Sequence, residues 1–120
     1  MELSGADDGR RRHRFHPEAL VELAAEADRL NEYSLMASTR FANAVSQAVT
    51  GVGEWPEAFP VWEDALTWPE WAEMPAIRSH RVTGYDFRIF YFAQPTIISI
   101  LAVASTRRKP GYWRARVSDY

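Results

Sequence analysis

The sequence predicts an α+β fold, in which a short N-terminal strand and an antiparallel helical hairpin pack on a three- to four-stranded antiparallel sheet. Two observations predict it. Residues 17–52 place apolar side chains at helical spacing, whereas residues 77–104 hold three runs of aromatic and β-branched residues separated by turn signals. The chain has 120 residues, 47% of them hydrophobic, which is enough for one domain with a buried core.

Residues 1–11 mix glycine, aspartate and arginine without periodicity, so we expect a disordered leader before a single domain at 12–120. The arginine-rich cluster at residues 10–14 is interpreted as a solvated arm, with a nucleic-acid contact as the alternative. Residues 12–15 are long enough only for a short strand.

The first helix is expected to begin at Pro17, because proline suits the first helical position. One apolar stripe follows at helical spacing: Leu20, Leu23, Ala24, Ala27 and Leu30. Three acidic residues share another face: Glu18, Glu22 and Glu26. Paired carboxylates can perform acid–base chemistry or bind a metal, but no histidine or aspartate has the helical spacing to join them. We therefore predict a solvated acidic face and no metal site.

A second helix is predicted from about Leu35 to Val52, and Gly51 and Gly53 mark its end. Its expected buried face consists of Phe41, Val45, Ala48, Val49 and Val52. The link between the two helices is only four residues long, which implies an antiparallel hairpin.

Residues 54–75 contain four prolines, and prolines at this density exclude a long helix or a central strand. We expect the aromatic side chains of this segment to pin it onto the sheet and the helices. A ligand cage is the alternative. These aromatic residues are Trp55, Phe59, Trp62, Trp68 and Trp71.

Three strands are predicted in an antiparallel meander: Ile77–Val82, Tyr85–Phe92 and Thr96–Ala104. The last strand leads into residues 106–114, where four basic residues, a Pro-Gly turn signal and two aromatic residues follow closely. We expect a cationic aromatic tail here. One interpretation is a non-catalytic module whose tail binds nucleic acid by phosphate contact and by stacking of Tyr112 and Trp113. The alternative is a packed segment in which Pro110-Gly111 turns the chain and Trp113 covers the sheet.

Charge is divided unevenly along the chain. Residues 15–74 hold two basic against eleven acidic residues, whereas residues 75–120 hold eight basic against two acidic residues. This asymmetry indicates two differently charged surfaces, one of which can meet a polyanion; acidic helices beside basic strands are the alternative explanation. The absence of cysteine excludes disulfides and thiolate metal sites. No secretory signal or membrane helix is recognisable, so we expect a cytoplasmic protein.

Five segments carry a family resemblance. They are Phe-His-Pro-Glu-Ala at 15–19, Glu-Ala-Phe-Pro at 57–60, residues 85–91, Ile-Leu-Ala-Val-Ala at 100–104, and Arg-Arg-Lys-Pro-Gly-Tyr-Trp-Arg at 107–114. In this order they resemble the RelE/ParE superfamily of bacterial type II toxins, and the resemblance covers about residues 12–116. The last segment is the most specific. Residues 65–76 depart from the family because this stretch is longer and richer in tryptophan.

The resemblance implies a growth-inhibiting toxin, of the kind found in plasmid stabilisation systems, that a cognate antitoxin neutralises and that needs no cofactor. Superfamily members either poison DNA gyrase (ParE-like) or cleave mRNA on the ribosome (RelE-like). For a ribonuclease, the resemblance implies Arg107 in the last strand, Arg81 or Arg78 in the meander, and Tyr112 or Trp113 after the last strand. His80 is the only histidine in the C-terminal half, so it would have to act as both base and acid. Lys109 is the only lysine, and arginine is a poor general base. We therefore favour gyrase poisoning over the ribonuclease or a non-catalytic nucleic-acid-binding module, and whether the chain is an enzyme stays open.

Target contacts are expected in the tail, at Arg107, Arg108, Lys109, Tyr112, Trp113 and Arg114. An antitoxin is expected to lay an amphipathic helix on the helical hairpin and to add a strand to a sheet edge. Its expected contacts are Leu20, Leu23, Ala27, Arg78, Arg81 and Arg88. A dimer and a toxin–antitoxin hetero-oligomer are both compatible with these surfaces.

Overall fold

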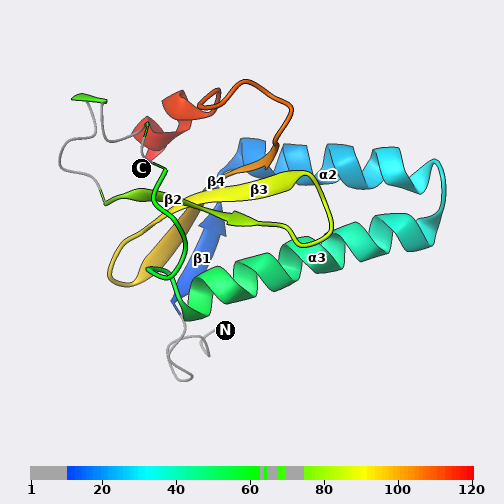
Figure 1. Cartoon of the computed structure of the whole chain (residues 1–120), viewed down its shortest axis with the longest axis horizontal. Helices are drawn as coiled ribbons and strands as arrows, with labels where there is room; N and C mark the ends of the chain where they lie inside the picture. The colour runs from blue at the N-terminus through cyan, green and yellow to red at the C-terminus, as the bar shows by residue number, and fades with distance from the viewer. Residues whose placement is uncertain (1–10, 63, 65–67, 70–74) are drawn as a thin grey trace.

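The structure is a computed structural model, and it describes residues 11–62, 64, 68–69 and 75–120. Of the predicted leader at 1–11, only Arg11 belongs to the described residues. Trp71 also lies outside the described residues. The elements, in chain order, are β1 (Arg12–Phe15), α2 (Pro17–Asn31), α3 (Leu35–Glu54), β2 (Ile77–Arg81), β3 (Phe87–Ala93), β4 (Ile97–Ser105) and a 3-10 helix, η3 (Arg114–Asp119). The predicted α+β class, helical hairpin and meander are confirmed (Figure 1).

The sheet is mixed, so the prediction of an antiparallel sheet was wrong in this respect. Its strand order is β1-β4-β3-β2, and β1 pairs with β4 in parallel. The helical hairpin is the cause: α3 returns the chain to the start of β1, where the Arg11 N–H donates to the Gly53 carbonyl at 3.3 Å. β2 therefore begins at the same end as β1, and the alternation of the meander makes β4 run the same way.

Local capping explains why both helices begin where the sequence predicts. The Glu18 backbone N–H donates to His16 Nδ1 at 3.1 Å, and Pro17 occupies the first helical position. At the start of α3 the Ala37 N–H donates to the Ser34 hydroxyl at 2.9 Å. The distal part of the hairpin extends beyond the sheet (Figure 1), and none of the described helices is long and apolar enough to cross a membrane.

The helices cover one face of the sheet, and the predicted buried face of α3 is confirmed. All five of its predicted core residues are buried: Phe41, Val45, Ala48, Val49 and Val52. They pack against residues of the same face of the sheet: Val82, Ile89, Tyr91, Ile98, Ile100 and Val103. This first core therefore depends on the two periodicities, 3.6 in the helix and 2 in the strands, that the sequence displays.

The predicted faces of α2 were partly wrong. Leu20 is 49% exposed, whereas Ala19 is fully buried in the first core. The side chains of Glu22 and Glu26 are only 12% and 14% exposed, so these two glutamates do not form a solvated acidic face. The reason is that α2 lies along the end of β4 that β1 leaves unpaired, and Glu22 fills this edge by accepting the Val103 N–H at 3.0 Å.

A second core covers the opposite face of the sheet. Ile77, Phe90, Phe92, Leu101, Ala102 and Ala104 from the strands pack with Trp113 and Val117, and Trp62, Trp68, Tyr112 and Tyr120 surround them. Of the aromatic residues expected to pin the proline-rich segment, Phe59 joins the first core and Trp62 and Trp68 join the second. Trp55 was wrongly included, because it follows the end of α3 and is 67% exposed.

The two cores give a first testable prediction. Trp113 is 1% exposed and packs against Phe90 and Trp62, so Trp113→Ala should lower the free energy of unfolding by about 3–5 kcal/mol in urea denaturation. Trp55→Ala is the matched control and should change it by no more than about 0.5 kcal/mol. Equal losses for the two variants would contradict the packing of the segment after β4 on the sheet.

Candidate functional site

A pocket of about 210 Å³ lies on the sheet face opposite the helices. We call it the basic pocket. Strands β2 and β3 form one wall, and the end of β4 with the segment after it forms the other. Its lining consists of Trp62, Ser79, Arg88, Phe90, Ala104, Ser105, Thr106, Arg108, Lys109, Pro110, Tyr112 and Trp113. The pocket thus combines an aromatic floor with hydroxyl groups and three cations.

The cations of the basic pocket are not equally neutralised. Arg88 Nε donates to the Ser79 hydroxyl at 3.1 Å, and among the described residues no carboxylate pairs with Arg88 or with Lys109. Arg108 pairs with Glu22 at 3.5 Å. A half-buried guanidinium without a carboxylate partner favours the binding of an anion, because the anion supplies the missing charge-assisted hydrogen bonds.

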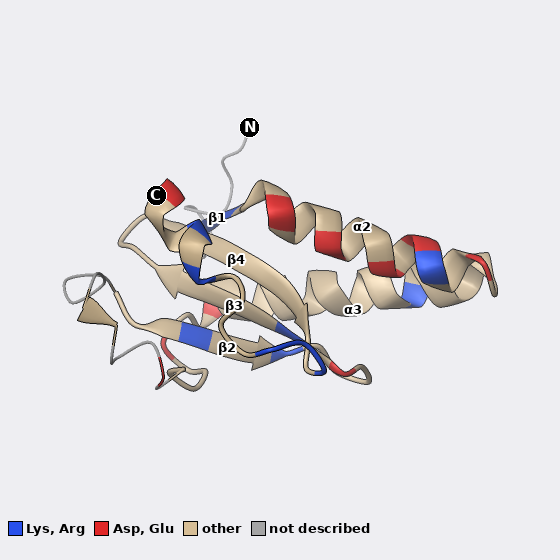
Figure 2. Ribbon diagram, turned by 90° about the horizontal axis from the view of Figure 1, so that it is seen from above, with Lys and Arg blue, Asp and Glu red and all other residues tan. Residues whose placement is uncertain are grey.

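Further basic residues lie around the pocket. Figure 2 shows the Lys and Arg ribbon segments gathered where β2 ends, β3 begins and the chain leaves β4. Arg81 is exposed beside Arg88, its cross-strand partner. The Arg107 side chain is 84% exposed and pairs loosely with Asp86 at 3.7 Å. This end of the sheet therefore carries a concentration of basic residues suited to a polyanion.

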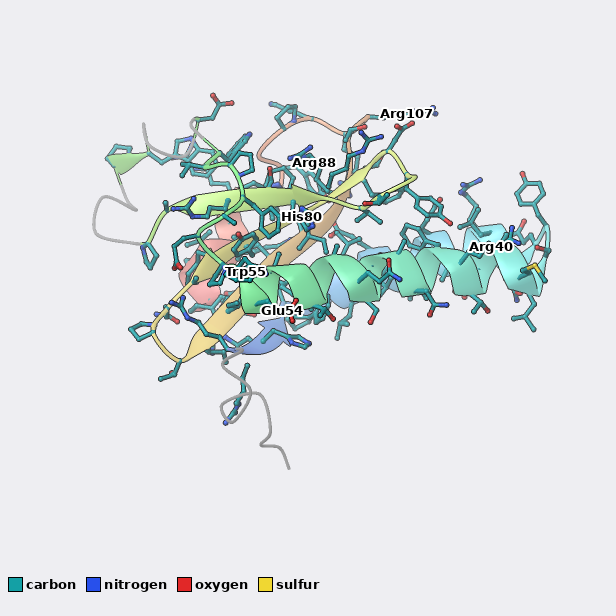
Figure 3. The ribbon with its side chains drawn as sticks, turned by 60° about the horizontal axis from the view of Figure 1, so that its bottom comes forward. Arg40, Glu54, Trp55, His80, Arg88 and Arg107 are labelled. Atoms are coloured by element: carbon teal, nitrogen blue, oxygen red, sulfur yellow. The ribbon has the colours of Figure 1, made fainter. Side chains whose placement is uncertain are left out.

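The expected ribonuclease residues do not converge on one point. His80 lies on the helix side of the sheet, where its ring stacks on Phe59 with centroids 3.7 Å apart, whereas Arg88 and Arg107 lie away from α3 (Figure 3). Burial lowers the pKa of His80, and the charge of Arg88 lowers it further. A neutral imidazole on the opposite face cannot transfer protons inside the basic pocket, because a base must reach the proton that it abstracts.

Tyr112 lines the basic pocket with its ring, but its hydroxyl donates to the Glu22 carboxylate. The guanidinium of Arg108 lies over this ring, 3.6 Å from its centroid. Burial raises the pKa of the Tyr112 phenol, and the hydrogen bond to Glu22 raises it further. The phenol is therefore neutral at physiological pH and occupied as a donor.

The other expected target contacts lie in different environments. Trp113 forms part of the pocket floor and is 1% exposed, so its faces are covered by protein rather than open to a base. Gly111 has a φ of 80°, which turns the chain and lets Trp113 reach the sheet. Arg114 is half-buried with its guanidinium 4.3 Å from the centroid of Trp68. Of the expected tail contacts, Arg107, Arg108 and Lys109 are the exposed ones.

The expected antitoxin contacts do not form one surface. Leu20 is exposed on α2, whereas Leu23 packs against the first core and Ala27 is half-buried. Arg78 Nη1 donates to the Phe59 carbonyl at 2.8 Å and to the Glu57 carbonyl at 3.2 Å, so it fastens the proline-rich segment to β2. Arg81 and Arg88 belong to the cationic end of the sheet instead.

Sequence analysis did not assign Ser79 or Glu22 to the site, and it assigned Arg88 to a different role. For Arg88 and Ser79 the sequence does hold a signal, the alternation of side chains between the two faces of a strand. Strand residues two apart share a face, so Ser79 lies with Arg81, and Arg88 lies with Phe90. No local signal marks Glu22, because its contacts lie more than eighty positions away in the sequence.

A histidine–carboxylate pair occurs outside the basic pocket. His16 Nε2 lies 2.6 Å from Asp119 Oδ2, at the junction of β1, α2 and η3. His16 is 7% exposed, and its Nδ1 accepts the Glu18 N–H, so Nε2 carries the proton and donates to Asp119. Both ring nitrogens are engaged by the protein. The pair fastens the C-terminal segment to the start of α2 rather than offering a base.

Comparisons with known proteins do not assign a family. No family model matches the chain, and no curated protein matches its sequence.

The contacts of Tyr112 predict its titration. A phenol whose folded pKa is raised stabilises the fold fully below about pH 10, and this contribution is lost as the pH rises through the folded pKa. Subtracting the phenolate absorbance titration of Tyr112→Phe from that of the unaltered chain should reveal a midpoint well above pH 10. A difference titration with its midpoint at about pH 10, the ordinary value for a phenol, would contradict the buried contact of Tyr112 with Glu22.

Proposed function

We propose that this chain is the toxin of a type II toxin–antitoxin pair and that it inhibits bacterial growth by poisoning DNA gyrase, in the manner of ParE-like members of the RelE/ParE superfamily. The family assignment is supported by the sequence resemblance over about residues 12–116. The element order β1-α2-α3-β2-β3-β4 agrees with the α+β fold that the resemblance implies.

One observation supports a binding function in preference to cleavage. The described residues that line the basic pocket offer guanidinium, ammonium, hydroxyl and aromatic groups, and its phenol is engaged by Glu22. Guanidinium groups hold anions well but do not exchange protons near neutral pH. The basic pocket is therefore equipped to bind a polyanionic surface and poorly equipped for general acid–base catalysis.

The mRNA endonuclease is the second candidate function. The observation that favours it is the composition of the basic pocket, where Arg88, Arg108 and Lys109 provide three cations suited to a phosphate. Cleavage would then depend chiefly on positioning and on charge stabilisation of the transition state. The two functions differ in their products: gyrase poisoning leaves cleaved DNA bound to gyrase, whereas the endonuclease leaves mRNA cut at codon positions.

The proposal includes a cytosolic location and a cognate antitoxin. We propose that the antitoxin supplies acidic residues to the cationic end of the sheet, since Arg81, Arg88 and Arg107 would attract them. It would thereby cover the surface that the target needs.

Expression of the chain without an antitoxin tests the proposed function directly. We expect growth arrest with a DNA-damage response, and purified protein should accumulate cleaved DNA with gyrase while mRNA on ribosomes stays intact. Codon-position mRNA cuts without gyrase-linked breaks would favour the endonuclease. Normal growth in the presence of abundant folded protein would refute both toxin functions.

The proposed function predicts the effect of a substitution at Arg88. Arg88→Gln removes one of the two pocket cations that have no carboxylate partner among the described residues. It should reduce gyrase poisoning at least about tenfold, because a contact to a charged group contributes about 1.5–3 kcal/mol. Arg40→Gln is the control, since Arg40 is exposed on α3 far from the pocket (Figure 3). Equal potency of the two variants, both folded by circular dichroism, would place the target contact elsewhere.

A further inference from the structure

The Glu22 carboxylate is the point where α2, β4 and the segment after β4 meet. Its Oε1 accepts the Val103 N–H at 3.0 Å and Arg116 Nη1 at 3.0 Å. Its Oε2 accepts Arg116 Nη2 at 2.9 Å, Arg108 Nη1 at 3.5 Å and the Tyr112 hydroxyl. One carboxylate that is 12% exposed therefore receives five hydrogen bonds.

The contacts of Glu22 divide into two groups. Val103 and Arg116 belong to the fold, because Arg116 Nη1 also donates to the carbonyl of Leu101 at 2.9 Å, and Leu101 is the residue that the irregularity in the β3–β4 pairing leaves without a partner. Arg108 and Tyr112 belong to the basic pocket, which both of them line. Both contacts of the second group join side chains, and neither satisfies a backbone group of the sheet.

We propose that Glu22 is a positioning residue of the basic pocket: it fixes the Tyr112 ring and holds the Arg108 guanidinium on that ring, so that this cation stands at the pocket wall. The inference rests on the proposed function in taking the basic pocket to be the target site. Without this anchor the Arg108 side chain, which is 55% exposed, would leave the pocket for much of the time.

The distances indicate that Arg108 keeps its charge available. Arg116 approaches Glu22 more closely than Arg108 does, and it does so with two nitrogens in a bidentate pair. The negative charge of Glu22 is thus shared mainly with Arg116. Arg108 is oriented by the carboxylate without being fully neutralised, and its remaining N–H groups can reach an anion in the pocket.

A positioning role and a purely electrostatic role of Glu22 predict opposite effects of Glu22→Gln on anion binding by the basic pocket. Removing a carboxylate beside a cationic pocket strengthens anion binding if only the local potential matters. If Glu22 positions Arg108, the same change weakens binding because the cation is released. The sign of the change therefore separates the two explanations.

Binding of inorganic pyrophosphate, followed by the fluorescence of the pocket tryptophans, provides the measurement. We expect Glu22→Gln to bind pyrophosphate about tenfold more weakly, the equivalent of one charge-assisted contact. Glu26→Gln removes the same charge from α2 one turn away, where Glu26 pairs with Arg29, and should leave binding unchanged or slightly stronger. Unchanged or tighter binding by Glu22→Gln would overturn the proposal.

A double variant distinguishes positioning from an effect of the unpaired Arg116 charge. Glu22→Gln combined with Arg116→Met removes one charge of each sign and restores the local charge balance, although the Leu101 carbonyl also loses its donor. If the unpaired charge of Arg116 is what disturbs the pocket, pyrophosphate binding should recover in the double variant. Positioning predicts that binding stays weak. Recovery of wild-type binding would overturn the proposal.

Tyr112→Phe keeps the test decisive if the double variant does not fold. It retains the ring and every charge and removes only the hydroxyl that ties the ring to Glu22. We expect weaker pyrophosphate binding, and wild-type affinity in this variant would refute the proposal. The proposed function is tested separately. A chain that binds pyrophosphate as expected but neither arrests growth nor poisons gyrase would refute the toxin function and leave the positioning role of Glu22 intact.

Discussion

The sheet is apolar on both faces along β3 and β4, and the rest of the structure follows from the need to cover both of them. Ile89 and Tyr91 face the helices, whereas Phe90 and Phe92 face the opposite side, and all four are buried. An antiparallel meander can leave one face to water, but a strand with large apolar side chains on both faces cannot. Two layers are therefore required, the helical hairpin on one side and the tryptophan-rich segments on the other.

The edge of β4 imposes the second constraint. β1 pairs with only the first part of β4, at Ile97–Ile100, and the remaining backbone groups on that side need other partners. Glu22 accepts the Val103 N–H, and Arg116 donates to the Leu101 carbonyl. Because both side chains also bind each other, completing this edge fastens α2 to the end of the chain.

These two constraints create the basic pocket. The second core brings the segment after β4 back across the sheet, and the Gly111 turn places Trp113 on it, so the basic residues 107–109 project at the rim instead of trailing into solvent. Arg88 and Ser79 come from the sheet below them. The result is a pocket lined by arginine, lysine and hydroxyl groups, and its chemistry suits recognition of an anion. This is the physical basis on which we favour a gyrase poison over a nuclease.

Sequence patterns by themselves determined the parts of the structure that depend on near neighbours. Proline at position 17, the spacing of Phe41, Val45 and Val52, and the aromatic and β-branched runs located both helices and the meander closely. The fold class followed from them, as did the concentration of basic charge near the end of the chain. Each of these signals lies within one helix turn or one strand, where backbone geometry alone relates sequence to structure.

Only the tertiary structure decided which side of α2 is buried, that β1 runs parallel to β4, and that Arg88 and Glu22 belong to the candidate site. The spacing of Leu20 and Leu23 admits more than one helix face, and a glutamate is ordinarily placed in solvent. What buries Glu22 is a set of donors 81 to 94 residues away, brought together by the covering of the sheet. Contacts at such separations leave no local periodicity, because they arise from the packing of whole elements.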